Sequence, residues 1–224
     1  MGLKIFSHNV QGFNSPNKRK KAFKHYKRLG ADIILVQETH FSAANHPQYF
    51  DKSFNQFHYT TYANKSRGVA IFIRNNIIFE IQNIYKDTDS RFLILKGSID
   101  RRNVTIASVY APNEAQSTFF TKFLDTLDQY NSPHLIIGGD FNLTSHPALD
   151  RSKVVSSSKA FPKSLNRSLS KLQLIDSWRA HNIGIKEYTH HLHPRWGCPL
   201  LPLIGVSTTL FFRTQQPFNK YIHI

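Results

Sequence analysis

The sequence is poor in cysteine and in acidic residues. Cys198 is the single cysteine among 224 residues, which excludes an internal disulfide bond and a zinc site built from cysteines. No run of about 18 apolar residues occurs, so the sequence predicts no transmembrane helix. The N-terminus has no signal-peptide pattern, and Phe6 stands where an N-myristoylation signal needs Ser or Thr. We therefore expect an intracellular protein that does not bind membranes.

The shortage of acid gives the chain a strong positive charge. Asp and Glu number 14 against 29 Lys and Arg, so the formal net charge is +15. This imbalance favours an anionic partner, most commonly nucleic acid, although a solvated basic surface is the alternative. A hydrophobic content of 40% is typical of a globular chain. The length suits one large α/β domain.

Short apolar runs predict the strands of this domain. Asn75-Asn76 separates two of them and indicates a hairpin. The expected strands are Leu3–Ser7, Asp32–Gln37, Gly68–Arg74, Ile77–Gln82, Phe92–Lys96, Asn103–Tyr110 and His134–Ile137, the last one stopping at Gly138-Gly139.

Three helices are expected between these strands. The first begins at Ser15-Pro16 and ends at Gly30, because Ser caps helices, Pro suits the first position and Gly suits the end. The others cover Thr118–Tyr130 and Ser164–Leu172. The first helix has basic faces that are either solvated or in contact with a DNA backbone; they carry Lys18, Arg19, Lys20, Lys21, Lys24, Lys27 and Arg28.

This mixture predicts an α/β fold of the α+β type. Two mixed sheets would pack together and be flanked by helices, which gives a four-layer α/β sandwich. The composition changes after Glu187, since residues 188–224 contain no Asp or Glu and four prolines interrupt any periodicity. No structure can be assigned to Pro199–Val206 from its pattern.

Polar residues follow four of the expected strands. In α/β sheets, such positions commonly build functional sites. Each of the four signals taken alone is weak, because an acid after a strand is more often a helix cap or a turn residue. The signals are His8-Asn9-Val10-Gln11-Gly12, Gln37-Glu38-Thr39-His40, Tyr110-Ala111-Pro112-Asn113 and Gly139-Asp140-Phe141-Asn142.

In this order the signals resemble the endonuclease/exonuclease/phosphatase superfamily. Within it, the chain is most similar to the endonuclease domain of the second open reading frame of LINE-type (non-LTR) retrotransposons. Gln11 and Phe141 favour that branch over the abasic-site endonucleases, which usually carry Asp and Leu there. The resemblance covers about residues 3 to 189 and extends through Gly68-Val69-Ala70-Ile71, Lys96-Gly97-Ser98-Ile99, Leu149-Asp150-Arg151-Ser152, Leu174-Ile175-Asp176 and Glu187-Tyr188-Thr189.

The resemblance implies roles that suit hydrolysis of a phosphodiester. Glu38 would bind Mg²⁺, or Mn²⁺ as an alternative, and Asn9 would orient Glu38 or contact the metal shell. Asp140 would activate the attacking water. Asn142 and Tyr110 would donate hydrogen bonds to phosphate oxygens as charge develops. These five residues are the expected catalytic set.

Three further positions match family residues near DNA: Asn113, Arg151 and Thr189. Purely structural roles remain open for two members of the catalytic set. Asn142 would then cap a turn, and Tyr110 would be a core aromatic with its hydroxyl at the rim.

The sequence departs from the family after Thr189. The family continues with a strand bearing Ser, a basic residue and Ile-Asp, and then a Ser-Asp-His segment whose histidine assists at the scissile phosphate. No Asp in this sequence is followed by His, and a histidine-rich loop is the preferred interpretation of His190-His191-Leu192-His193. A frameshift or an alternative splice would explain this change. We expect an incomplete domain over residues 1–189, a divergent tail over 190–224, and missing C-terminal strands that leave a sheet edge exposed.

The expected function is a Mg²⁺-dependent DNA endonuclease that nicks one strand of target DNA for retrotransposon integration, impaired by the missing Asp and Ser-Asp-His motifs. One alternative is an inactive, basic DNA-binding remnant, and another is a phosphatase or ribonuclease of the same superfamily. DNA is the expected partner of a monomeric, nuclear protein. The reverse transcriptase domain of full-length relatives is absent from the sequence.

Overall fold

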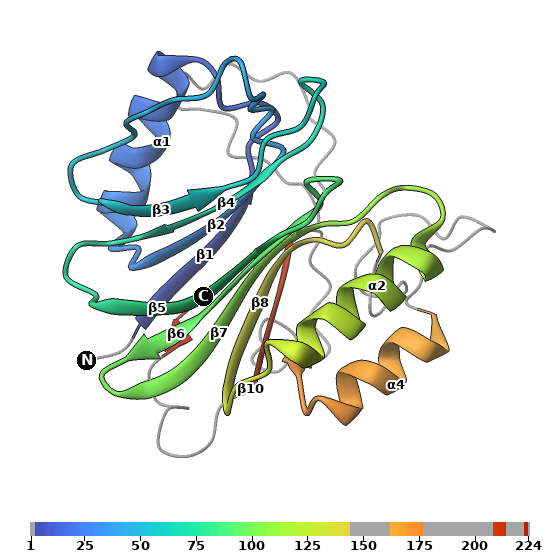
Figure 1. Ribbon diagram of the computed structural model, residues 1–224. Coiled ribbons are helices and arrows are strands. Elements are labelled where there is room, and N and C mark those ends of the chain that lie inside the picture. Colours follow the sequence, from blue (N-terminus) through green and yellow to red (C-terminus); the bar gives the residue numbers. More distant parts are fainter. Residues whose placement is uncertain (1–2, 144–161, 177–207, 214–221, 224) are drawn as a thin grey trace, which may run out of the picture.

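Two mixed β-sheets pack face to face in the computed structural model, which describes residues 3–143, 162–176, 208–213 and 222–223 (Figure 1). The first sheet has the order β11 (Ile222–His223), β1 (Leu3–Asn9), β2 (Ile33–Gln37), β4 (Val69–Ile73) and β3 (Gln56–Tyr59). The second has the order β5 (Phe79–Lys86), β6 (Phe92–Ile99), β7 (Arg102–Tyr110), β8 (His134–Asp140), β10 (Thr208–Arg213) and β9 (Ile175–Asp176).

Helices cover the outer faces of the two sheets. α1 (Pro16–Leu29) packs on the first sheet, and α2 (Gln116–Gln129) and α4 (Lys163–Lys171) pack on the second (Figure 1). Three apolar clusters fill the three interfaces between these layers: one between α1 and the first sheet, one between the sheets, and one between the second sheet and its helices. The four-layer sandwich predicted from the sequence is therefore confirmed. No helix in the described part of the chain is long and apolar enough to cross a membrane.

The predicted bounds of α1 are confirmed by its caps. The Ser15 hydroxyl accepts a hydrogen bond from the Lys18 backbone N–H, and Pro16 occupies the first turn. Gly30 ends the helix at φ 72°, a conformation that glycine adopts without strain. Phe23 anchors the helix, since it is fully buried and its ring lies 5.1 Å from the ring of Phe72 on β4.

The hairpin predicted at Asn75-Asn76 is wrong. The strands on either side of this turn, β4 and β5, belong to different sheets. β4 is already paired on both edges, with β2 and with β3, so the following strand has no free edge to join. The Asn75 side chain donates instead to the backbone carbonyl of Lys52 at 2.8 Å.

β8 continues through the glycine pair at which the sequence predicted its end. It runs from His134 to Asp140, and every residue in it is buried. A β-carbon at Gly139 would collide with the backbone carbonyl of Val109 on β7, and one at Gly138 would collide with Leu35 of the facing sheet. Glycine at these two positions lets the strands and sheets pack closely. The strand therefore continues to Asp140, which is its last residue.

The predicted loss of C-terminal strands is corrected by β10. This strand comes from the divergent tail and pairs antiparallel with β8 over Thr208–Arg213. Leu210 packs into the cluster between the sheets, whereas Phe211 packs into the cluster beneath α2 and α4. Apolar side chains thus bury both faces of the strand, and β10 covers an edge of β8, whereas we expected a sheet edge to be left exposed.

Candidate active site

The four polar signals of the sequence meet at one end of the sandwich. β1 and β2 are parallel, with Asn9 opposite Gln37, so Asn9 lies beside the start of the loop that carries Glu38. β7 and β8 are also parallel, with Tyr110 opposite Asp140. Because the two sheets pack face to face, the ends of these strands face each other across the interface between the sheets.

The side-chain amide of Asn9 joins the two sheets. Its Nδ2 donates to Glu38 Oε1 at 2.8 Å and to Asp140 Oδ2 at 3.1 Å. Its Oδ1 accepts from the Gln11 backbone N–H at 3.1 Å, which fixes the orientation of the amide. One amide group thus brings Asn9, Glu38 and Asp140 together at the junction of the two sheets. Only 5% of the surface of Asn9 is exposed, so these hydrogen bonds are shielded from water.

Left-handed backbone conformations gather in the loops of this site. Gln11, Glu38, His40 and Asn142 have φ between 46° and 59° without being glycine. Such conformations are uncommon outside glycine and cluster at functional sites. Backbone hydrogen bonds hold the loops together, with the Gly12 N–H donating to the Glu38 carbonyl at 2.7 Å.

Asp140 accepts hydrogen bonds on both carboxylate oxygens. Oδ2 faces Asn9, and Oδ1 accepts from the Asn142 backbone N–H at 3.0 Å. The Asn142 side chain donates to the Ala111 carbonyl at 2.7 Å, which is the turn-capping contact considered as its structural role. Its amide carries a second hydrogen, so this contact does not use up its donor capacity.

Tyr110 is half-buried beside the Glu38 carboxylate. Burial and the neighbouring Glu38 carboxylate raise the pKa of Tyr110 to about 12. The phenol therefore stays protonated at neutral pH, as a hydrogen-bond donor must.

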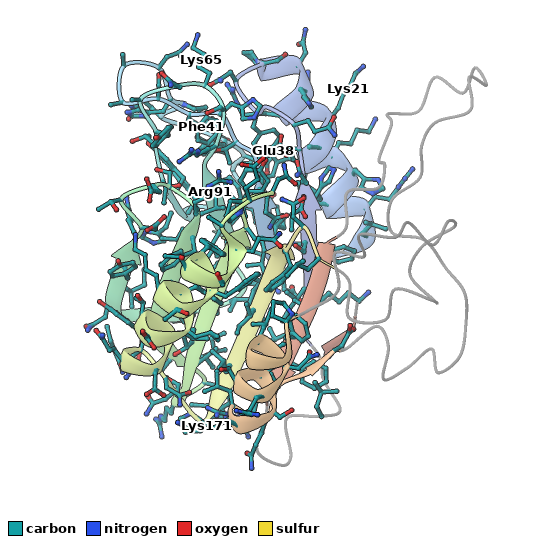
Figure 2. All side chains as sticks on the ribbon, turned by 90° about the vertical axis from the view of Figure 1, so that its right-hand side faces the viewer. Lys21, Glu38, Phe41, Lys65, Arg91 and Lys171 are labelled. Carbon is teal, nitrogen blue, oxygen red and sulfur yellow. The ribbon has the colours of Figure 1, made fainter. Side chains whose placement is uncertain are left out.

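Sequence reasoning missed two side chains beside Glu38 and Tyr110. The guanidinium carbon of Arg91 lies 5.0 Å from the centre of the Tyr110 ring, and His40 Nε2 lies 3.5 Å from Glu38 Oε2. Figure 2 labels Arg91 and Glu38, both in the upper half of the view. His40 belongs to one of the polar signals, but its position alone indicates no role, and no pattern in the sequence singles out Arg91.

The residues expected near DNA are only partly described. Asn113 is exposed in the loop after β7, three residues beyond Tyr110. Arg151 and Thr189 lie outside the described residues, and so does the histidine-rich segment at 190–193.

The two carboxylates on the Asn9 amide fit a hard cation. Among the described residues, no group of three or more His, Cys, Asp and Glu could hold a metal ion. Mg²⁺ does not need such a cage, since it binds one or two carboxylates and keeps several waters. Glu38 and Asp140 supply two carboxylates that lie within hydrogen-bond distance of one amide nitrogen.

Residues 6–199 match the Endonuclease/Exonuclease/phosphatase family. The chain belongs to this family. Membership confirms the resemblance drawn from the ordered motifs at the level of the superfamily.

Solved structures show the same fold. An AP endonuclease from Archaeoglobus fulgidus matches with a TM-score of 0.65 at 17% identity, over 94% of this chain and 86% of that one. AP endonuclease LMAP from Leishmania major matches with 0.65 at 14% identity, over 93% and 78%. The endonuclease domain of TRAS1, a telomere-specific non-LTR retrotransposon, matches with 0.59 at 14% identity, over 96% and 86%. At these identities the likeness shows the fold of this family member.

Proposed function

We propose that this family member is the endonuclease domain of a LINE-type retrotransposon, which nicks one strand of DNA in a Mg²⁺-dependent reaction. The observation that carries the proposal is the Asn9 amide, which holds Glu38 and Asp140 together at the junction of the two sheets. The net charge of +15 favours a long polyanion over a small phosphoester. The retrotransposon branch is supported by Gln11 and Phe141 and by the likeness to the TRAS1 domain.

Each residue of the site has a definite task in this reaction. Glu38 would hold Mg²⁺, which supplies charge neutralisation at the phosphate when it is bound. Asp140 is held by hydrogen bonds on both oxygens and accepts the proton of the attacking water. Tyr110, protonated at neutral pH, and Asn142 donate hydrogen bonds to the phosphate oxygens.

We further propose that this copy is slower than relatives that carry the Asp–His pair. β10, the strand beside Asp140, has the sequence Thr-Thr-Leu-Phe-Phe-Arg and brings no carboxylate to the site. No Asp-His pair occurs in the sequence. Loss of one acid–base group typically lowers a rate by about 10²–10⁴-fold. A binding-only remnant is the second candidate. The chain keeps a net charge of +15, which favours DNA binding, but it lacks the Asp–His pair.

A plasmid-nicking assay tests the proposal. With Mg²⁺, the wild-type protein should convert supercoiled plasmid to the nicked circle slowly, and EDTA should stop it. Glu38→Gln and Asp140→Asn should abolish nicking, whereas Asp125→Asn, which removes an exposed carboxylate on α2, should leave the rate unchanged. Equal residual nicking in all three variants would indicate a contaminating nuclease. No nicking by the wild type, with DNA binding retained, would establish the binding-only remnant.

A further inference from the structure

The sequence of α1 is basic throughout. Its 14 residues include seven Lys and Arg and no acid. The apolar stripe formed by Ala22, Phe23 and Tyr26 is buried against the first sheet. The fold therefore uses one face of the helix and leaves the opposite face in solvent.

Arg19 and Lys27 are basic residues of α1 whose side chains hold the helix to neighbouring loops. The Arg19 guanidinium donates to the carbonyl oxygens of Phe13 and Asn14 at 2.9 and 2.6 Å. Lys27 forms an ion pair with Asp51 at 2.8 Å. These contacts fasten the helix to neighbouring loops, so the roles of these two residues need no external ligand.

Four other basic residues form a surface, here called the basic face: Lys20, Lys21, Lys24 and Arg28. All four are exposed, and at 100° per residue they lie opposite the buried stripe. In the part of the chain that the structure describes, none of them has a carboxylate within ion-pair distance. Same-sign neighbours three and four residues apart destabilise a helix, so folding alone does not account for this arrangement.

The N-terminal end of α1, where the basic face begins, lies next to the candidate active site. Lys18, at the start of α1, donates to the carbonyl oxygen of Gln11 at 3.1 Å in the loop that follows Asn9. The Glu38 charge acts on the Lys18 ammonium and opposes the lowering of its pKa by burial. Figure 2 shows Lys21 pointing outward from α1 in the upper half of the view, where Glu38 also lies, whereas Lys171 lies at the bottom.

We propose that the basic face binds the phosphate backbone of duplex DNA beside the nicked position. From Lys20 to Arg28 the basic face is about 12 Å long, which matches the duplex length that holds about three or four phosphates of one strand. A membrane surface fits less well, because the apolar stripe that would enter the lipid is buried in the fold. This inference rests on the proposed function, from which it takes DNA as the polyanion.

Two variants with equal loss of charge test the proposal. In the first, Lys20, Lys21 and Lys24 on the basic face are replaced by Gln. In the second, Arg101→Asn, Arg167→Gln and Lys171→Gln remove three exposed positive charges from the β6–β7 turn and from α4. Binding to a short fluorescent DNA duplex is measured by anisotropy in EDTA over a range of salt concentrations, so no cleavage takes place.

The first variant should bind at least about tenfold more weakly near 100 mM salt, and its slope of log affinity against log salt should fall by about 2 to 3. The second variant should keep the wild-type slope to within about 1. The melting temperature of the first variant should not fall, because like-charged neighbours are removed. Equal weakening of both variants would overturn the inference, as would wild-type binding by the first.

Two parallel probes separate this inference from other ligands and from the proposed function. If the first variant lost binding to a single-stranded RNA of the same length, or to phosphatidylserine vesicles, but kept duplex binding, the proposal of a DNA surface would be wrong. Nicking by the wild type tests the catalytic proposal independently. If the wild type does not nick DNA but the first variant still binds it more weakly, the basic face is supported as a DNA-binding surface and the catalytic proposal is contradicted.

Discussion

At the scale of single residues, Asn9 is the side chain on which the site depends. One amide nitrogen serves two carboxylates that belong to different sheets. An amide suits this position because it donates without carrying charge, whereas a cation would neutralise the carboxylates and compete with a metal ion. Substitution at Asn9 should therefore act on stability and on metal dependence together.

Asn9→Asp should lower the free energy of unfolding in EDTA by about 1–3 kcal/mol, because two hydrogen bonds are lost and a third carboxylate enters a buried cluster. Mg²⁺ should restore part of that loss by binding the folded state. Urea unfolding with and without Mg²⁺ measures both effects. Asn103→Asp, which makes the same chemical change at an exposed position on β7, is the control. Equal stability of both variants in EDTA would contradict this account of Asn9.

His8 should make the protein sensitive to acid. Burial lowers the pKa of His8 from 6.5 to about 4, and the charges of His25 and Lys18 add to this effect. The unfolded chain binds a proton near pH 6.5, whereas the folded chain does so only near pH 4. The stability that comes from the neutral ring, at most about 3 kcal/mol, is thus complete above pH 6.5 and is lost as the pH falls toward 4.

Urea unfolding at about pH 7.5 and about pH 4.5 measures this loss. The loss should be smaller in His8→Gln than in the wild type. It should persist in Tyr26→Phe, which removes the hydroxyl 2.6 Å from His8 Nδ1 but keeps the buried ring. An identical loss in wild type and His8→Gln would show that other groups carry the acid sensitivity.

Sequence reasoning could find the polar residues that follow strands but not the contacts between them. Asn9, Glu38 and Asp140 each follow an apolar run, and parallel strands bring such positions to one sheet edge. Arg91 precedes β6, and its place over Tyr110 depends on the register of β6 against β7 and on the turn before it. A pattern along one chain does not encode such a cross-strand neighbour.

At the scale of elements, β8 is limited by the space around its glycines. Gly139→Ala should lower the free energy of unfolding by about 3 kcal/mol or more, because the new methyl group meets the Val109 carbonyl rather than a movable side chain. Gly30→Ala should cost only about 1–2 kcal/mol, because its positive φ is strained but its surroundings have room. Chemical denaturation gives both values. A Gly139→Ala protein as stable as Gly30→Ala would show that β7 and β8 can move apart.

The same elements show where local signals fail. Gly138-Gly139 has the composition of a turn, yet it lies within a strand because two sheets and two strands approach closely there. Asn75-Asn76 does form a turn, yet the strands on either side separate into two sheets, since β3 and β2 occupy both edges of β4. Caps are different: Ser15 and Gly30 set the ends of α1 through contacts within a few residues, so the sequence predicted them correctly.

At the scale of the whole molecule, the charge of +15 opposes compaction and favours polyanions. Raising NaCl from about 50 to about 300 mM should therefore raise the melting temperature of the free protein by a few degrees through screening. The further rise produced by duplex DNA should shrink over the same range, because counterion release weakens binding. Thermal unfolding with and without duplex measures both trends. A melting temperature that falls with salt in the free protein would contradict the repulsion argument.

The Asn9 bridge also has a consequence for the protein while it is being made. The Asn9 amide and the Asp140 carboxylate that it contacts are far apart in the chain, since 131 positions separate the two residues. At about 5–20 residues per second, a ribosome needs on the order of ten seconds to add Asp140 after Asn9. A nascent chain that exposes Asn9 and Glu38 thus has half of the candidate site, which is complete only when the second sheet has been synthesised and has docked.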